Sequence, residues 1–209
     1  MKTLMLGILI LFGASGAALA AGDAAAGKAK TATCAACHGP DGNSQAPTFP
    51  KLAGQHEKYL LKQLKDIKSG ARPVATMAGQ LDDKSEQDLA DIAAYYASQS
   101  ISVGQTKEAL RAKGEAIYRG GISDREVPAC TACHSPTGQG NGPAGFPALG
   151  GQHAEYTASQ LKSFRAAADG DPSGRANDGE EARTMRSIAI RMTDSEIEAV
   201  ASYIAGLHP

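Results

Sequence analysis

Two copies of one short motif contain every cysteine of this chain, C-A-A-C-H at residues 34–38 and C-T-A-C-H at residues 130–134. Cysteines three positions apart share one face of a helix, so both thiols can bond the edge of one macrocycle. The histidine that follows then lies under the metal, as the proximal ligand of a c-type haem does. The motifs therefore predict two covalently bound haem c groups. The predicted attachment and proximal residues are Cys34, Cys37, His38, Cys130, Cys133 and His134.

Three other uses of a Cys-x-x-Cys pair fit this sequence less well. A structural zinc site needs a fourth ligand at compact spacing, and neither half supplies an obvious one. A thioredoxin-like motif belongs in a βαβ pattern, which the sequence lacks. Disulfide bonds fit an oxidising compartment, but they leave the repeated histidine unexplained.

The second axial ligand of each iron must come from the remaining histidines and methionines. Beyond the first 20 residues these are Met77, Met185, Met192, His56, His153 and His208. Met77 and Met185 are 108 residues apart, and each precedes a tyrosine of the last helix in its half by 18 residues. We therefore expect Met77 and Met185 to be the second axial ligands of the two irons. The alternative is that both are ordinary core methionines.

The other candidates fit axial ligation less well. Met192 aligns with Lys84, which has no sulfur, so we expect Met192 to pack in the core. His56 and His153 also repeat, so ligation by two histidines per iron stays an alternative. Each begins a predicted helix soon after the proximal loop, which favours a helix cap or a contact with a haem propionate. His208 has no counterpart and is expected in an exposed tail.

One proline follows each proximal histidine, Pro50 after 12 residues and Pro147 after 13. A metal-bound histidine usually donates its outer N–H to a nearby oxygen. We expect each proline carbonyl to accept that hydrogen bond. The alternative is that the two are only loop prolines.

An internal repeat predicts the architecture that positions these residues. The haem motifs are 96 residues apart, F-P-K-L-A-G-Q-H and F-P-A-L-G-G-Q-H are 97 apart, and the last helices are 108 apart. Strand-like alternation is missing, so we predict an all-α fold of two tandem domains, residues 21–100 and 101–209, joined near 99–105. The second half has 11 extra residues, expected as a surface loop within 169–184, where Gly, Asp, Asn and Pro are frequent.

Helix signals recur in both halves. Apolar residues at helical spacing predict middle helices over 55–69 and 152–168. Capping boxes at Ser85 and Thr193 predict the start of each last helix. Asp23 is expected to cap a short first helix, which the second half repeats up to Gly120.

The first 20 residues are typical of a secretory signal peptide, with Lys2, an apolar run over 4–12 and the small-residue site Ala18-Leu19-Ala20. We expect cleavage after Ala20 and export to the periplasm; an uncleaved anchor is the alternative. No later segment is apolar enough to span a membrane. The net charge is −1 and basic stripes interleaved with aromatics are missing, so no nucleic-acid partner is expected.

Together these motifs resemble class I cytochromes c, and their tandem arrangement resembles the cytochrome c4 family of periplasmic dihaem electron carriers. The resemblance covers the chain from about residue 22 to residue 207. It implies iron ligation by His38 with Met77 and by His134 with Met185. It also implies proline carbonyls at Pro50 and Pro147. The chain departs from the family pattern at residues 82–84 and in the 169–184 segment, both near the methionine side.

An iron with histidine and methionine on its two axial sites has no open position for a substrate, which predicts an electron carrier and no enzyme. The resemblance implies a membrane quinol-oxidising complex as donor and a terminal oxidase as acceptor. We expect a monomer, which a partner can hold at a membrane surface. The alternative is a dihaem peroxidase-type enzyme, which needs one open iron and predicts dissimilar halves.

The paired motifs predict that both haems survive extraction with acid-acetone, because thioether bonds resist a treatment that removes non-covalent haem. Intact mass of the extracted protein should exceed the mass of the polypeptide by two haem groups. Loss of either haem in this treatment would contradict the prediction.

Overall fold

The computed structural model describes residues 21–176 and 179–209, and the predicted signal peptide over 1–20 lies outside them. The described residues form helices and loops, and their only β-type pairings are two isolated bridges, Ile122 with Val127 and Asn141 with Phe146. The all-α prediction is therefore confirmed. Among the described helices, none is both long and apolar enough to cross a membrane.

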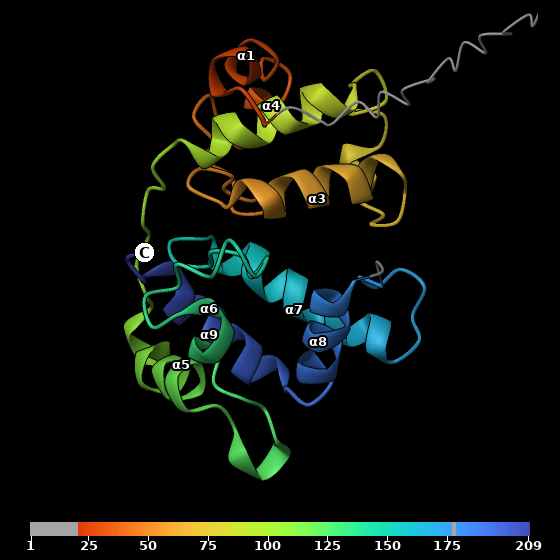
Figure 1. Cartoon of the computed structure of the whole chain (residues 1–209). Coiled ribbons are helices and arrows are strands. Elements are labelled where there is room, and N and C mark those ends of the chain that lie inside the picture. Colours follow the sequence, from red (N-terminus) through yellow and green to blue (C-terminus); the bar gives the residue numbers. More distant parts are fainter. Residues whose placement is uncertain (1–20, 177–178) are drawn as a thin grey trace, which may run out of the picture.

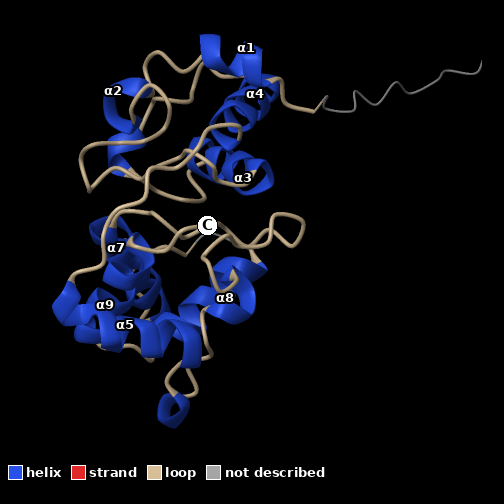
Figure 2. Ribbon diagram, turned by 90° about the vertical axis from the view of Figure 1, so that its left-hand side faces the viewer, coloured by secondary structure: helices blue, strands red, loops and turns tan. Residues whose placement is uncertain are grey.

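The two halves of the chain form two helical units, one above the other in Figures 1 and 2. The first contains α1 (Ala24–Ala29), α2 (Ala35–His38), α3 (Glu57–Lys68), η1 (Ala75–Met77) and α4 (Glu86–Ala97). The second contains α5 (Glu108–Gly120), η2 (Ser123–Arg125), α6 (Thr131–His134), α7 (Ala154–Ala168), α8 (Glu180–Ala189) and α9 (Asp194–Ala205). The helix-free stretch 98–107 connects them. We propose the boundary between domains 21–100 and 101–209 within this connection.

The predicted helix starts are present. The Asp23 carboxylate accepts hydrogen bonds from two backbone N–H groups at the start of α1. Ser85 with Asp88 forms the capping box of α4, and Thr193 with Glu196 forms that of α9. In each box two backbone donors that lack a helical partner are satisfied by side chains.

In each half the first helix crosses the last helix at close range. A Cβ added to Gly27 of α1 would lie 1.9 Å from the Asp91 carbonyl oxygen of α4. A Cβ added to Gly114 of α5 would lie 2.3 Å from the Ala199 carbonyl oxygen of α9. Glycine at these positions allows the backbones to approach. The last helix of each unit is thereby held against the first. Its tyrosine, Tyr95 in α4 or Tyr203 in α9, lies in the hydrophobic core of that unit.

The prediction of a surface loop over 169–184 is wrong in two respects. Helix α8 begins at Glu180, inside that range. Ala182 and Ala189 of α8 are buried against Phe164, with Met185 packed on the same cluster. Apolar residues at helical spacing overrode the turn-forming residues that precede them, because burying them stabilises the helix more than propensity opposes it. Arg175, within the remaining loop, is also buried.

The close crossing of α5 and α9 predicts that Gly114→Ala destabilises the second domain by about 1–3 kcal/mol, the usual cost of overpacking. Gly120, in the same helix, has nothing within 4 Å of an added Cβ. Gly120→Ala should therefore be neutral or stabilise by up to about 1 kcal/mol, since glycine loses more backbone entropy in a helix. Thermal unfolding of the two variants makes the comparison. Equal effects would contradict the packing argument.

Candidate haem-binding sites

Each Cys-x-x-Cys-His motif forms a single helical turn. The backbone N–H of His38 donates to the Cys34 carbonyl at 2.9 Å, and His134 repeats the bond to Cys130 at 2.9 Å. No disulfide bond joins any of the four cysteines, all of which lie in the described residues, so the alternative of structural disulfides has no support. Within the described ranges, no group of three or more His, Cys, Asp or Glu is arranged to hold a metal ion.

The two proximal histidines are buried and held by the prolines that the sequence analysis identified. The distance from Nδ1 to the proline carbonyl oxygen is 2.9 Å for His38 with Pro50 and 2.9 Å for His134 with Pro147. This confirms the predicted hydrogen bond. It fixes the tautomer and the ring orientation, and it leaves Nε2 available to a metal. Burial lowers the pKa of both histidines, which favours the neutral imidazole that metal ligation requires.

Met77 in η1 and Met185 in α8 line the same cavity as the two motifs. The cavity has a volume of about 480 Å³ and runs from one half of the chain into the other. Its lining is mainly apolar, as the faces of a haem require. The structure thus brings all eight predicted site residues around one cavity: Cys34, Cys37, His38, Met77, Cys130, Cys133, His134 and Met185. Their bonds to haem stay a prediction.

The other candidate axial ligands lie outside the cavity or make other contacts. Met192 is buried in the core of the second half, as expected, although it also lines the cavity. His56 and His153 do not line the cavity, and neither side chain caps its helix, so the capping prediction is wrong. Each instead reaches the other half: His56 Nε2 lies 2.8 Å from the Gln139 carbonyl, and His153 Nε2 lies 2.9 Å from the Ser44 carbonyl. His208 is exposed, as predicted.

Sequence reasoning missed a reciprocal contact between the two halves. The Gln55 side chain accepts from the Ala148 backbone N–H at 2.9 Å and donates to the Ala148 carbonyl at 2.9 Å. Gln152 forms the same pair of bonds with the Lys51 backbone, both at 2.9 Å. The repeat contained the signal, because Gln55 and Gln152 are 97 residues apart in matching runs. The repeat marks the two glutamines as equivalent, but it does not show that each side chain bonds the other domain.

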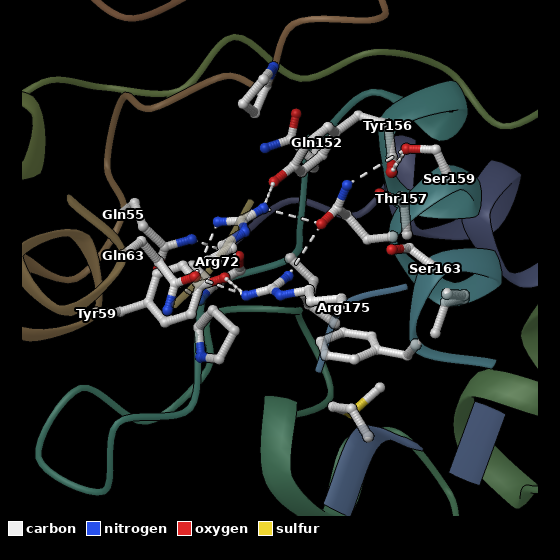
Figure 3. Close-up of a pocket in the computed structure, with 18 of the residues that line it drawn as sticks. Gln55, Tyr59, Gln63, Arg72, Gln152, Tyr156, Thr157, Ser159, Ser163 and Arg175 are labelled. Carbon is white, nitrogen blue, oxygen red and sulfur yellow. Dashed lines mark hydrogen bonds between the residues drawn. The ribbon is translucent and has the colours of Figure 1, made fainter. Parts of the chain in front are cut away.

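Two arginines of the cavity lining were also missed. Arg72 and Arg175 are buried between the halves, where Figure 3 shows them side by side. They occupy equivalent positions: the Arg72 N–H donates to the Asp66 carbonyl, and the Arg175 N–H donates to the Ser163 carbonyl, both at 2.9 Å. The two arginines are 103 residues apart, a spacing that matches none of the repeat offsets of 96, 97 and 108. The extra residues of the second half therefore lie on both sides of Arg175. For this reason the alignment of the two halves did not pair Arg72 with Arg175.

Known proteins share both the internal repeat and the two-domain fold. The family model for cytochrome c matches residues 24–100 and again residues 112–208. Cytochrome c4 of Pseudomonas aeruginosa is 56% identical over 208 residues, and the match covers 100% of both chains. The crystal structure of reduced recombinant cytochrome c4 from Pseudomonas stutzeri superimposes with a TM-score of 0.84 at 55% identity, over 90% of this chain and 100% of that one.

The chain belongs to the cytochrome c4 family. It is a dihaem c-type cytochrome that carries electrons, and its two domains hold two covalently bound haem c groups. Its partners are accordingly redox proteins. A more distant relative, the thiosulfate dehydrogenase electron acceptor of Thiomonas intermedia, is 36% identical over 87% of this chain and 81% of its own length.

The reciprocal glutamine contact predicts that Gln152→Ala weakens the docking of the two haem domains. The substitution leaves the buried Lys51 N–H and carbonyl without partners, at a cost of about 1–3 kcal/mol. Gln105→Ala, at an exposed position in the connection, is the control and should cost less than about 0.5 kcal/mol. Denaturant unfolding measures both. A Gln152→Ala variant as stable as the control would show that the contact contributes nothing.

Proposed function

We propose that each domain of this cytochrome c4 relative holds its haem iron between one histidine and one methionine. The proposed pairs are His38 with Met77 and His134 with Met185, and the proposed thioether attachments are Cys34, Cys37, Cys130 and Cys133. One observation carries the proposal: in both halves a buried histidine, held by a proline carbonyl, shares an apolar cavity with a methionine. The donor set and the apolar lining fit a haem.

Closed axial sites make the protein a carrier of single electrons and not an enzyme. A haem supplies an iron that gains or loses one electron. The protein supplies both axial ligands and a rigid, apolar surrounding, so little rearrangement accompanies the change of charge. The carbonyls of Pro50 and Pro147 hold the imidazoles in one orientation.

A dihaem peroxidase-type enzyme is the other candidate, and the methionines argue against it. That chemistry needs one iron with an open or displaceable site. Here both domains place a methionine on the cavity lining. The relative named as the electron acceptor of thiosulfate dehydrogenase supports a carrier as well.

We place the mature protein in the periplasm, after removal of residues 1–20 by cleavage following Ala20. It takes electrons from a membrane quinol-oxidising complex and delivers them to a terminal oxidase, as a monomer that associates with the membrane surface only through its partners. N-terminal sequencing of the exported protein should begin at Ala21. Membranes supplied with quinol should reduce the purified protein, and an isolated terminal oxidase should reoxidise it. Failure of both reactions would refute these partners.

The ligand assignment predicts different outcomes for two methionines of the second domain. Met185→Ala should open the second iron, lower its potential and allow imidazole to bind there, while the first haem keeps its spectrum. Met192→Leu should leave both irons six-coordinate and cost less than about 1.5 kcal/mol, as volume-conserving core substitutions usually do. The charge-transfer band of methionine-ligated ferric haem, measured for both variants, makes the test.

The matched variant in the first domain is Met77→Ala, which should open only the first iron. If Met192→Leu instead removes the methionine band of one haem, Met192 is the ligand and the assignment of Met185 is wrong. If the parent protein shows a high-spin signal from one haem, the peroxidase-type alternative gains support.

A further inference from the structure

One lysine ammonium is buried where the two domains and their connection meet. Lys51 of the first domain is only 8% exposed. Its Nζ donates to the carbonyl oxygen of Ser102, in the connection, and to the carbonyl oxygen of Gly151, in the second domain, the latter at 3.1 Å. Burial of a charge is strongly unfavourable unless it is paired and hydrogen-bonded. A lysine at this position therefore has a cost that a surface lysine does not have.

This ammonium has no negative partner in the described part of the chain. Its acceptors there are two backbone carbonyls, and no carboxylate pairs with it. Burial lowers the pKa of Lys51, whereas hydrogen bonds donated to carbonyl oxygens favour the charged form. The domain interface therefore holds a positive charge that no described anion neutralises.

The charge lies between the loops that hold the two proximal histidines. Lys51 directly follows Pro50, whose carbonyl holds the histidine of the first domain. Gly151 lies four residues after Pro147, whose carbonyl holds the histidine of the second domain. The repeat aligns Lys51 with Ala148, so the second domain supplies no matching charge. One ammonium is thus bonded to the surroundings of both candidate iron sites.

The charge of Lys51 also acts on a titratable group of the second domain. Burial lowers the pKa of the half-buried His153, and the positive charge of Lys51 lowers it further. The hydrogen bond to the Ser44 backbone and the charge of Glu155 act in the opposite direction. Because a buried charge is screened by salt less than an exposed one, the field of Lys51 crosses from its own domain into the other.

We propose that the buried charge of Lys51 raises the reduction potentials of both haems. The inference rests on the proposed haem sites, because Lys51 lines the cavity that those sites share. A positive charge favours the reduced state of an iron, since reduction adds one electron. Because its side chain is fixed between both proximal loops, one lysine acts on two haems.

Two neutral variants of Lys51 test the effect of the charge. Lys51→Gln keeps a hydrogen-bond donor and Lys51→Met keeps the length of the side chain. Each should lower both potentials by at least a threefold change in the one-electron equilibrium constant, which is about 28 mV at about 59 mV per tenfold change. Lys51→Arg keeps the charge and should retain most of the parent's potentials. Spectroelectrochemical titration of the full dihaem protein measures both haems.

Two controls separate the charge of Lys51 from its structural contacts. Lys58→Met removes an exposed lysine that also reaches the other domain, with its Nζ 2.9 Å from the Pro143 carbonyl oxygen, and should leave both potentials unchanged. Asn43→Ala removes two hydrogen bonds to the connection, with the Ser102 N–H at 2.7 Å and the Ser100 carbonyl at 3.0 Å, without a change of charge. It should destabilise the protein and leave both potentials unchanged.

NMR titration of His153 in the reduced protein gives a second readout that does not depend on the iron potentials. Removal of the charge in Lys51→Gln or Lys51→Met should raise the pKa of His153, because the charge lowers it in the parent. Lys58→Met should leave that pKa unchanged. A purely structural role for Lys51 would not produce this difference together with lower potentials.

Three results would overturn the proposal. The first is a pair of neutral Lys51 variants with two six-coordinate haems and the potentials of the parent. The second is a shift confined to one haem in both variants. The third is an Asn43→Ala variant whose potentials fall as far as theirs, since the docking of the domains would then set the potentials. A parent that lacks one haem or one methionine band would instead contradict the proposed haem sites.

Discussion

The hydrogen bond from a histidine Nδ1 to a proline carbonyl, 2.9 Å in both domains, connects the candidate iron ligand to the rest of the molecule. The residue after each proline is the one whose backbone pairs with a glutamine of the other domain, Lys51 with Gln152 and Ala148 with Gln55. One loop therefore orients the imidazole on its inner side and docks the neighbouring domain on its outer side. A shift of that loop would move the candidate iron ligand and the domain interface together.

The same two-fold pattern continues through the interface. Three kinds of contact between the domains repeat in this way. They are the glutamine side chains on the backbone, the histidine side chains on backbone carbonyls, and the arginine pair inside the cavity. Because these contacts are reciprocal, each domain completes the surroundings of the other. Two tandem copies of a cytochrome c domain thus act as one body, in which the surroundings of each haem site depend on both halves of the chain.

The two sites differ most on the methionine side. Met77 lies in the short 3₁₀ helix η1, whereas Met185 lies in the ten-residue helix α8. Met185 also packs against a buried cluster of Phe164, Ala182 and Ala189 that contains no first-domain residue. Differences in packing and solvent access around otherwise equal ligand sets change a haem potential. The structure therefore supplies a physical basis for two unequal sites on a symmetric scaffold.

The sequence by itself determined the chemistry, because covalent haem attachment requires the Cys-x-x-Cys-His spacing, and it determined the helices whose caps and periodicity are local. The offset of 108 also paired Met77 with Met185 and Tyr95 with Tyr203. Only the tertiary structure placed Arg175 opposite Arg72, showed α8 in a segment rich in turn-forming residues, and assigned His56 and His153 to the interface. The physical reason is that these features depend on contacts between residues far apart in the chain. Such contacts leave no periodic signal, and the inserted residues on both sides of Arg175 removed the one alignment that would have shown it.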